Sequence, residues 1–185
     1  APSANTSGRI SPTTARHVAE DFGARLELVL DGGPATVGLE STILKVEGET
    51  IRLLRPGGLD AAEVERVIGR PVLRNEKASA TIEAPGMLAS HYAPDAPVRL
   101  DAIDVRPGEV LIRFGGKPLP GEADAALVLD LSPAGNLAEA AANLFGYMKK
   151  ADAANAPSIA FSPIPSEGLG EAINDRLQRA AAPRS

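Results

Sequence analysis

Residues 126–161 read ALVLDLSPAGNLAEAAANLFGYMKKADAANAPSIAF, and this stretch decides the fold. Apolar runs at 126–131 and 158–161 are typical of buried strands. Between them, residues 137–150 place apolar side chains at helical spacing, which predicts an amphipathic helix. Its apolar stripe consists of Leu137, Ala140, Ala141, Leu144, Phe145 and Met148. A strand, a helix and a second strand in succession predict a parallel α/β layer.

The same alternation continues on both sides of this stretch. A further strand is predicted near 109–114 and a final helix near 168–181, so residues 98–185 are expected to form one small α/β domain. Within the final helix, residues 172–177 place polar side chains between apolar ones. We assign these polar groups to a solvated face with local ion pairs, and no chemistry to them.

The first 74 residues alternate less regularly. Ser11 is placed to cap a helix that begins at Pro12, and Gly23 supplies a stop at its C-terminus. Strands are predicted at 26–30, 41–46 and 51–54, a capped helix at 60–68, and an edge strand at 71–73. Periodicity then disappears from 75 to 97, which is typical of a linker that is functional or disordered.

Composition limits the class of protein. The 185 residues carry a net charge of −5, so a basic nucleic-acid module is not expected. Without cysteine there can be no disulfide, thiolate metal site or cysteine nucleophile. No apolar run reaches the ~18 residues of a membrane span, and no signal peptide is recognised, so we expect a cytoplasmic protein.

Two regions carry candidate anion-binding groups. The loop 1–14 contains Ser3, Asn5 and Ser7, whose hydroxyls and amide suit phosphate and adenosine, although such residues also make ordinary turns. It matches neither a Walker sequence nor a dinucleotide fingerprint. Arg55 ends a predicted strand just before a Pro-Gly-Gly loop, where it is either an anion ligand or a surface arginine.

Three further positions leave alternatives open. Ser41 offers a hydroxyl at the start of a predicted strand, next to Thr42, which could be an ordinary strand residue. His91 and Tyr92 lie in the aperiodic segment of a chain with only two histidines and two tyrosines, and either function or packing explains them. His17 is expected in a solvated position, and no cluster has the spacing of a zinc or iron site.

Several motifs together resemble the threonylcarbamoyl-AMP synthase family in its two-domain form. They are PSANTSG at 2–8, SPT at 11–13, GLESTI at 38–43, LRPG at 54–57, PGM at 85–87, SHYAP at 90–94 and IPSEGLGEAINDRL at 164–177. The resemblance implies an α/β fold in three parts. These are the C-terminal half of a YrdC-like α/β catalytic domain at 1–74, a long interdomain linker over the active site at 75–97, and a small Rossmann-like α/β domain at 98–185.

The resemblance also implies an activity. The family joins L-threonine, bicarbonate and ATP into threonylcarbamoyl-AMP and releases pyrophosphate, for the threonylcarbamoyladenosine modification of tRNA. Mg²⁺ is expected with the ATP, held by the substrate rather than by a protein metal site. Other tRNA-modification proteins are expected as partners, while a membrane is not, nor is direct RNA binding at this charge.

Roles for individual residues follow only from the resemblance. Arg55 and Ser41 are expected to be catalytic, with Ser41 facing threonine. Nucleotide contacts are expected from Ser3, Asn5, Ser7, Arg55 and His91, and a linker lid from His91 and Tyr92.

One part of the family pattern is missing. The first half of the catalytic domain, with its Lys-x-Arg element, has no counterpart here, so the expectation is that this chain is the C-terminal portion of a synthase. The alternative is a non-catalytic interaction or regulatory module that acts through its C-terminal α/β domain.

Overall fold

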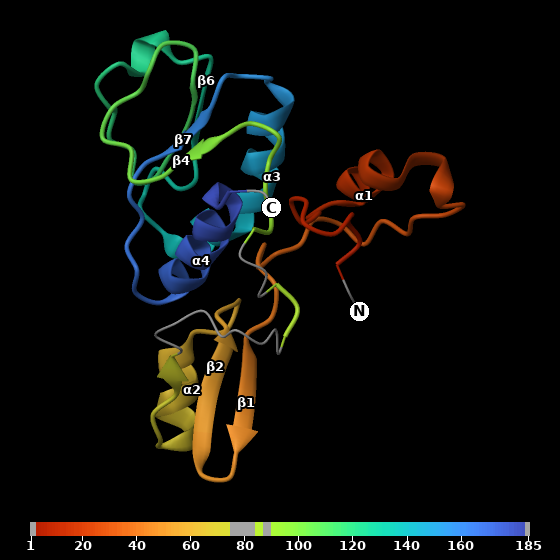
Figure 1. Cartoon of the computed structure of the whole chain (residues 1–185), viewed down its shortest axis with the longest axis vertical. Coiled ribbons are helices and arrows are strands. Elements are labelled where there is room, and N and C mark those ends of the chain that lie inside the picture. The colour runs from red at the N-terminus through yellow and green to blue at the C-terminus, as the bar shows by residue number, and fades with distance from the viewer. Residues whose placement is uncertain (1–2, 75–83, 87–89, 184–185) are drawn as a thin grey trace.

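A computed structural model describes residues 3–74, 84–86 and 90–183 (Figure 1). One sheet has three strands in the order β1-β2-β3, and the other has four in the order β4-β7-β5-β6. The strands are β1 (Ile43–Glu47), β2 (Thr50–Arg55), β3 (Leu73–Arg74), β4 (Val98–Arg99), β5 (Val110–Arg113), β6 (Leu127–Asp130) and β7 (Ile159–Phe161). The helices are α1 (Ala15–Phe22), α2 (Ala61–Ile68), α3 (Leu137–Ala153) and α4 (Leu169–Ala181), with 3₁₀ turns at Gly23–Arg25 and Glu122–Asp124.

The four-stranded sheet is entirely parallel, which confirms the α/β layer predicted from the strand and helix alternation. Because successive strand residues face opposite sides, Val110 and Ile112 pack into the large core against α3 and α4, whereas Leu111 packs into a smaller cluster on the other face. Figure 1 shows α3 and α4 packed together beside this sheet.

The three-stranded sheet begins with an antiparallel hairpin, β1 and β2, and β3 then pairs with β2 in parallel after α2. Helix α2 starts at Asp60, whose carboxylate accepts a hydrogen bond from the Ala62 amide, and ends at Gly69 in the left-handed conformation. Its buried face packs on Leu53 of β2. The helix therefore holds the hairpin that ends at Arg55.

Two predictions in the N-terminal part are wrong. The first helix is capped by Thr14, not Ser11, and begins at Ala15 rather than Pro12. The Ser11 hydroxyl instead donates a 2.6 Å bond to the Glu40 carboxylate, a stronger acceptor than a turn could offer. Residues 26–30 form no strand, because no described strand pairs with them, and their alternating leucines lie exposed.

The N-terminal segment packs directly on the parallel-sheet part. Gly38 lies so close to α3 that a Cβ atom on it would be 2.2 Å from the Ala141 carbonyl oxygen. Lys149 of α3 forms a 2.9 Å ion pair with Asp21 of α1. In the described part of the chain, no helix is both long and apolar enough to cross a bilayer. The segment between the sheets is described only at 84–86 and 90–97, so much of the predicted linker lies outside the described residues.

Candidate functional site

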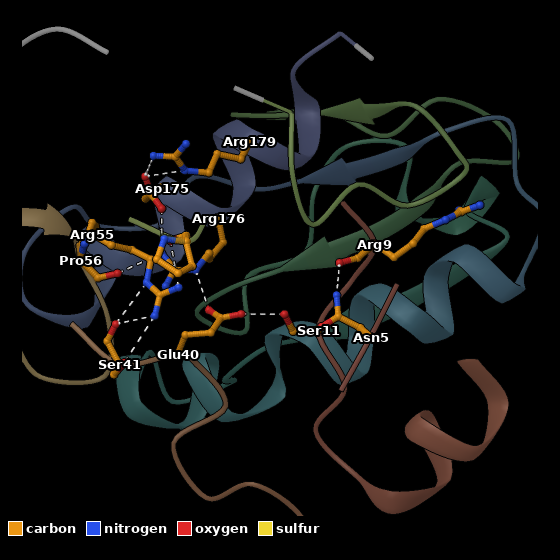
Figure 2. A network of polar contacts seen from close by, with 11 residues as sticks. Asn5, Arg9, Ser11, Glu40, Ser41, Arg55, Pro56, Asp175, Arg176 and Arg179 are labelled. Carbon is orange, nitrogen blue, oxygen red and sulfur yellow. Dashed lines mark hydrogen bonds and ion pairs between the residues drawn. The ribbon is translucent and has the colours of Figure 1, made fainter. Parts of the chain in front are cut away.

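Arg55 ends β2 with its side chain buried and its guanidinium bonded to neutral groups (Figure 2). Its Nη2 and Nε donate to the main-chain oxygen of Ser41 at 2.9 and 3.2 Å, and its Nη1 donates to the Pro85 carbonyl at 3.2 Å. The Ser41 hydroxyl accepts a longer bond of 3.4 Å from Nη2. Among the described residues no carboxylate pairs with Arg55, so no ion pair in this part of the chain balances its positive charge.

An ion pair between buried Arg176 and partly buried Glu40 lies beside this arginine. Arg176 of α4 donates from Nε to Glu40 at 2.8 Å, and Ser11 donates to the other carboxylate oxygen of Glu40. Burial tends to raise the pKa of Glu40, but the charge of Arg176 and the Ser11 hydroxyl outweigh it and lower that pKa. Glu40 is therefore ionised at neutral pH and bound on both oxygens.

The sequence analysis missed Arg176, because its segment was assigned to a solvated face. Its side chain is fully buried, so that assignment is wrong. The signal was present in the helical spacing. Arg176 follows Ala172 by four residues and Ile173 by three, which places it on the apolar stripe of α4. A charged side chain on a buried stripe requires a partner of opposite charge, and that partner is Glu40.

Tyr92 is a core residue with a positive φ of 60°. Its ring is 1% exposed, lies 5.4 Å from the ring of Phe145, and faces the Arg176 guanidinium at 5.2 Å. The neighbouring His91 is half-buried and meets the Tyr92 ring edge-on at 4.1 Å. The pKa of His91 is lowered, chiefly by burial and further by the positive charge of nearby cations such as Arg179. Tyr92 is thus packed in the core, whereas the His91 Nδ1 atom is buried without a partner among the described residues.

The predicted nucleotide loop, residues 1–14, meets the ion pair beside Arg55 through Ser11, which bonds to Glu40, whereas its Ser3 lies at a separate cavity. Ser3 lines an open cavity of about 350 Å³ together with Thr14 at the start of α1 and with Gly33. Asn5 donates from Nδ2 to two carbonyls of its own loop, and its Oδ1 is buried without a described partner. Ser7 is exposed.

The structure brings some predicted site residues together but not others. Arg55 and Ser41 are in direct contact, while Asn5 lies on the far side of Ser11 and Glu40 from Arg55 (Figure 2). The cavity at Ser3 does not include Ser41 or Arg55 in its lining. Nor do any three His, Asp or Glu side chains gather as metal ligands within the described ranges.

Comparisons with known proteins cover the whole chain. The family model described as "Threonylcarbamoyl-AMP synthase, C-terminal domain" matches residues 59–182, and one described as "Telomere recombination" matches residues 1–57. The chain is 38% identical to the threonylcarbamoyl-AMP synthase of Pyrococcus abyssi and 35% identical to that of Bacillus subtilis, in each case over 100% of its own length. It spans 58% and 57% of these two relatives, a little over half of their length.

Two solved structures of P. abyssi Sua5 also match this chain. A crystal structure of P. abyssi Sua5 complexed with L-threonine has a TM-score of 0.82 and 34% sequence identity, and the match covers 97% of this chain and 56% of that one. A variant of that protein with a histidine and the following tyrosine replaced by alanine matches equally well, with a TM-score of 0.82 and 32% identity.

Proposed function

Because this chain belongs to the threonylcarbamoyl-AMP synthase family, we propose that it takes part in making threonylcarbamoyl-AMP from L-threonine, bicarbonate and ATP. The relative complexed with L-threonine supports threonine as the amino acid substrate. The product would serve threonylcarbamoyladenosine formation in tRNA, in the cytoplasm. Residues 1–74 would supply part of the catalytic site, residues 75–97 the linker over it, and residues 98–185 the second domain.

Arg55 carries the proposal. A buried guanidinium without a carboxylate partner among the described residues costs free energy unless an anion binds to it. Its hydrogen bonds to the Ser41 and Pro85 carbonyls fix its position without neutralising it. A triphosphate supplies the missing negative charge.

The chemistry needs charge stabilisation and alignment more than a covalent nucleophile. An oxygen of the threonine carbamate attacks the α-phosphorus of ATP, a new P–O bond forms, and the bond to the pyrophosphate oxygen breaks. Arg55 would stabilise the charge that develops on the phosphates, and the Ser41 hydroxyl would lie at the threonine side. Asn5 and His91 each have a buried polar atom that a nucleotide could satisfy. Mg²⁺ would arrive bound to ATP, as part of the substrate.

Calorimetry on the 185-residue chain with MgATP tests this assignment. We expect binding, and we expect Arg55→Ala to weaken it about 10- to 100-fold, the loss typical of hydrogen bonds to a charged group. Arg52→Ala is the matched control, because Arg52 lies on the same strand and is paired with Glu47. Its affinity should match that of the unchanged chain.

Two outcomes would contradict the assignment. If Arg55→Ala binds MgATP as tightly as Arg52→Ala does, Arg55 does not hold the phosphates. If the chain binds no nucleotide but associates with another tRNA-modification protein, the non-catalytic interaction module is the better description.

A further inference from the structure

Arg176 joins the C-terminal helix to both chain segments that carry the candidate site. Its Nε bonds to Glu40 at 2.8 Å, and its Nη1 bonds to the Pro56 carbonyl oxygen at 2.9 Å. Glu40 directly precedes Ser41, and Pro56 directly follows Arg55. One side chain from α4 therefore bonds to the immediate neighbour of each candidate catalytic residue, as Figure 2 shows.

The two segments are also tightly apposed. The Gly58 amide donates to the Glu40 carbonyl at 2.9 Å, and a Cβ atom on Gly57 would lie 2.3 Å from that same oxygen. Nothing but backbone fits between them at this point. A small displacement of either segment would thus change the distance from Arg55 to Ser41.

The surroundings of Arg176 hold its guanidinium in one place. Asp175 accepts a 2.7 Å bond from Nη1, and the Tyr92 ring lies against the guanidinium. Burial favours the neutral form of Arg176, but Tyr92 and the Glu40 carboxylate outweigh it and raise its pKa, so the group stays charged. A buried ion pair is often no more stabilising than apolar residues of the same size. What Arg176 offers beyond apolar packing is therefore directed hydrogen bonds that fix the positions of its partners.

We propose that Arg176 is a positioning residue, which holds the ends of the two segments so that Arg55 keeps its place beside Ser41 and faces a bound triphosphate. This inference rests on the proposed function, since it assumes that Arg55 binds the phosphates of ATP. It makes the C-terminal domain part of the site's architecture, although Arg176 itself need not touch the substrate.

The test measures two properties of each variant of the 185-residue chain, its affinity for MgATP and the NMR signal of the Arg55 side chain. Arg176→Met keeps most of the side-chain volume and removes the bonds to Glu40, Pro56 and Asp175, and we expect at least a tenfold loss of MgATP affinity. In the nucleotide-free Arg176→Met variant, we also expect the ¹⁵N-resolved Nε–H resonance of Arg55 to shift or broaden relative to the unchanged chain. Arg176→Lys, which retains the charge for Glu40, should recover part of the affinity.

Arg74→Ala is the matched control. Arg74 also pairs with α4, through Glu171 at 2.8 Å, but it contacts neither Glu40 nor Pro56. Its affinity and its Arg55 resonance should be unchanged. If Arg176→Met fails to fold, MgATP affinity and the Arg55 resonance are measured in Arg176→Lys and Glu40→Gln instead, and these test the positioning role.

The outcomes separate the two proposals. Folded Arg176 variants that keep both the full affinity and the unchanged Arg55 resonance would overturn the positioning role, while Arg55→Ala still tests the phosphate contact. If the unchanged chain binds no MgATP, the proposed function fails. In that case a shifted Arg55 resonance in Arg176→Met would still show that Arg176 fixes the Arg55 side chain, and an unshifted one would reject that as well.

Discussion

Gly86 approaches Tyr92 so closely that a Cβ atom on the glycine would lie 2.6 Å from the phenolic oxygen. The same atom would be 3.3 Å from the side chain of Arg55, and the glycine has a φ of +80°. We therefore expect Gly86→Ala to lower the free energy of unfolding by roughly 1–3 kcal/mol, through backbone strain and displacement of the ring. Urea unfolding followed by circular dichroism measures this loss.

Gly48→Ala separates the two causes. Gly48 also has a positive φ, of +60°, but a Cβ atom on it, in the hairpin turn, would meet nothing within 4 Å. Its substitution should cost only about 1 kcal/mol, the conformational part. Equal losses in the two variants would mean that the approach to Tyr92 contributes nothing.

A second prediction concerns acid stability. Glu109 is buried, and although burial tends to raise its pKa, hydrogen bonds from Arg99 and Ser158 and from the Arg106 amide outweigh it and lower the pKa to about 2. Because the folded pKa lies below the unfolded value, the carboxylate stabilises the fold above about pH 4.5 and loses this effect as the pH falls towards about 2. The contribution is on the order of 3 kcal/mol.

Glu109→Gln tests the sign of this effect. Urea unfolding at a series of pH values should show the variant well below the unchanged chain near neutral pH, with the gap narrowing as the pH falls below about 4.5. Glu47→Gln is the control, since Glu47 is an exposed carboxylate between Lys45 and Arg52. A gap for Glu109→Gln that stays constant down to about pH 2 would argue against the lowered pKa.

A third prediction follows from the missing strand at 26–30. Leu28 and Leu30 are 74% and 85% exposed, so Leu28→Ser should change the free energy of unfolding by less than about 0.5 kcal/mol. Leu144→Ala, in the core on α3, should cost about 2–5 kcal/mol. A large loss in Leu28→Ser would show that this segment is packed in solution.

The contrast between these leucines explains how far the sequence could predict the structure. The alternation at 26–30 is typical of a strand with one apolar face, but a strand also needs a partner, and no described strand supplies one. The parallel sheet was predictable because its helices show helical spacing and its longer strands are continuous apolar runs. Two-residue strands such as β4 show none, and exist only through pairing with β7.

In the candidate site too, local features could be predicted from the sequence and long-range contacts could not. The pattern around Arg55, a strand end before a Pro-Gly-Gly loop, is local and could be recognised. The partnership of Glu40 with Arg176 joins residues 136 positions apart, and no local pattern encodes it. Helical spacing could still have shown that Arg176 lies on a buried face.

The last prediction locates the nucleotide with the two histidines of the chain. Burial, and nearby cations that include Arg55, lower the pKa of His91. A triphosphate bound at Arg55 brings negative charge to this region, so MgATP should raise the His91 pKa, measured from the pH dependence of its ring proton resonances. His17 is the internal control, because it accepts a bond from the amide of Thr13, which lines the other cavity with Ser3. A rise at His17 without one at His91 would place the phosphates near Ser3 and contradict their assignment to Arg55.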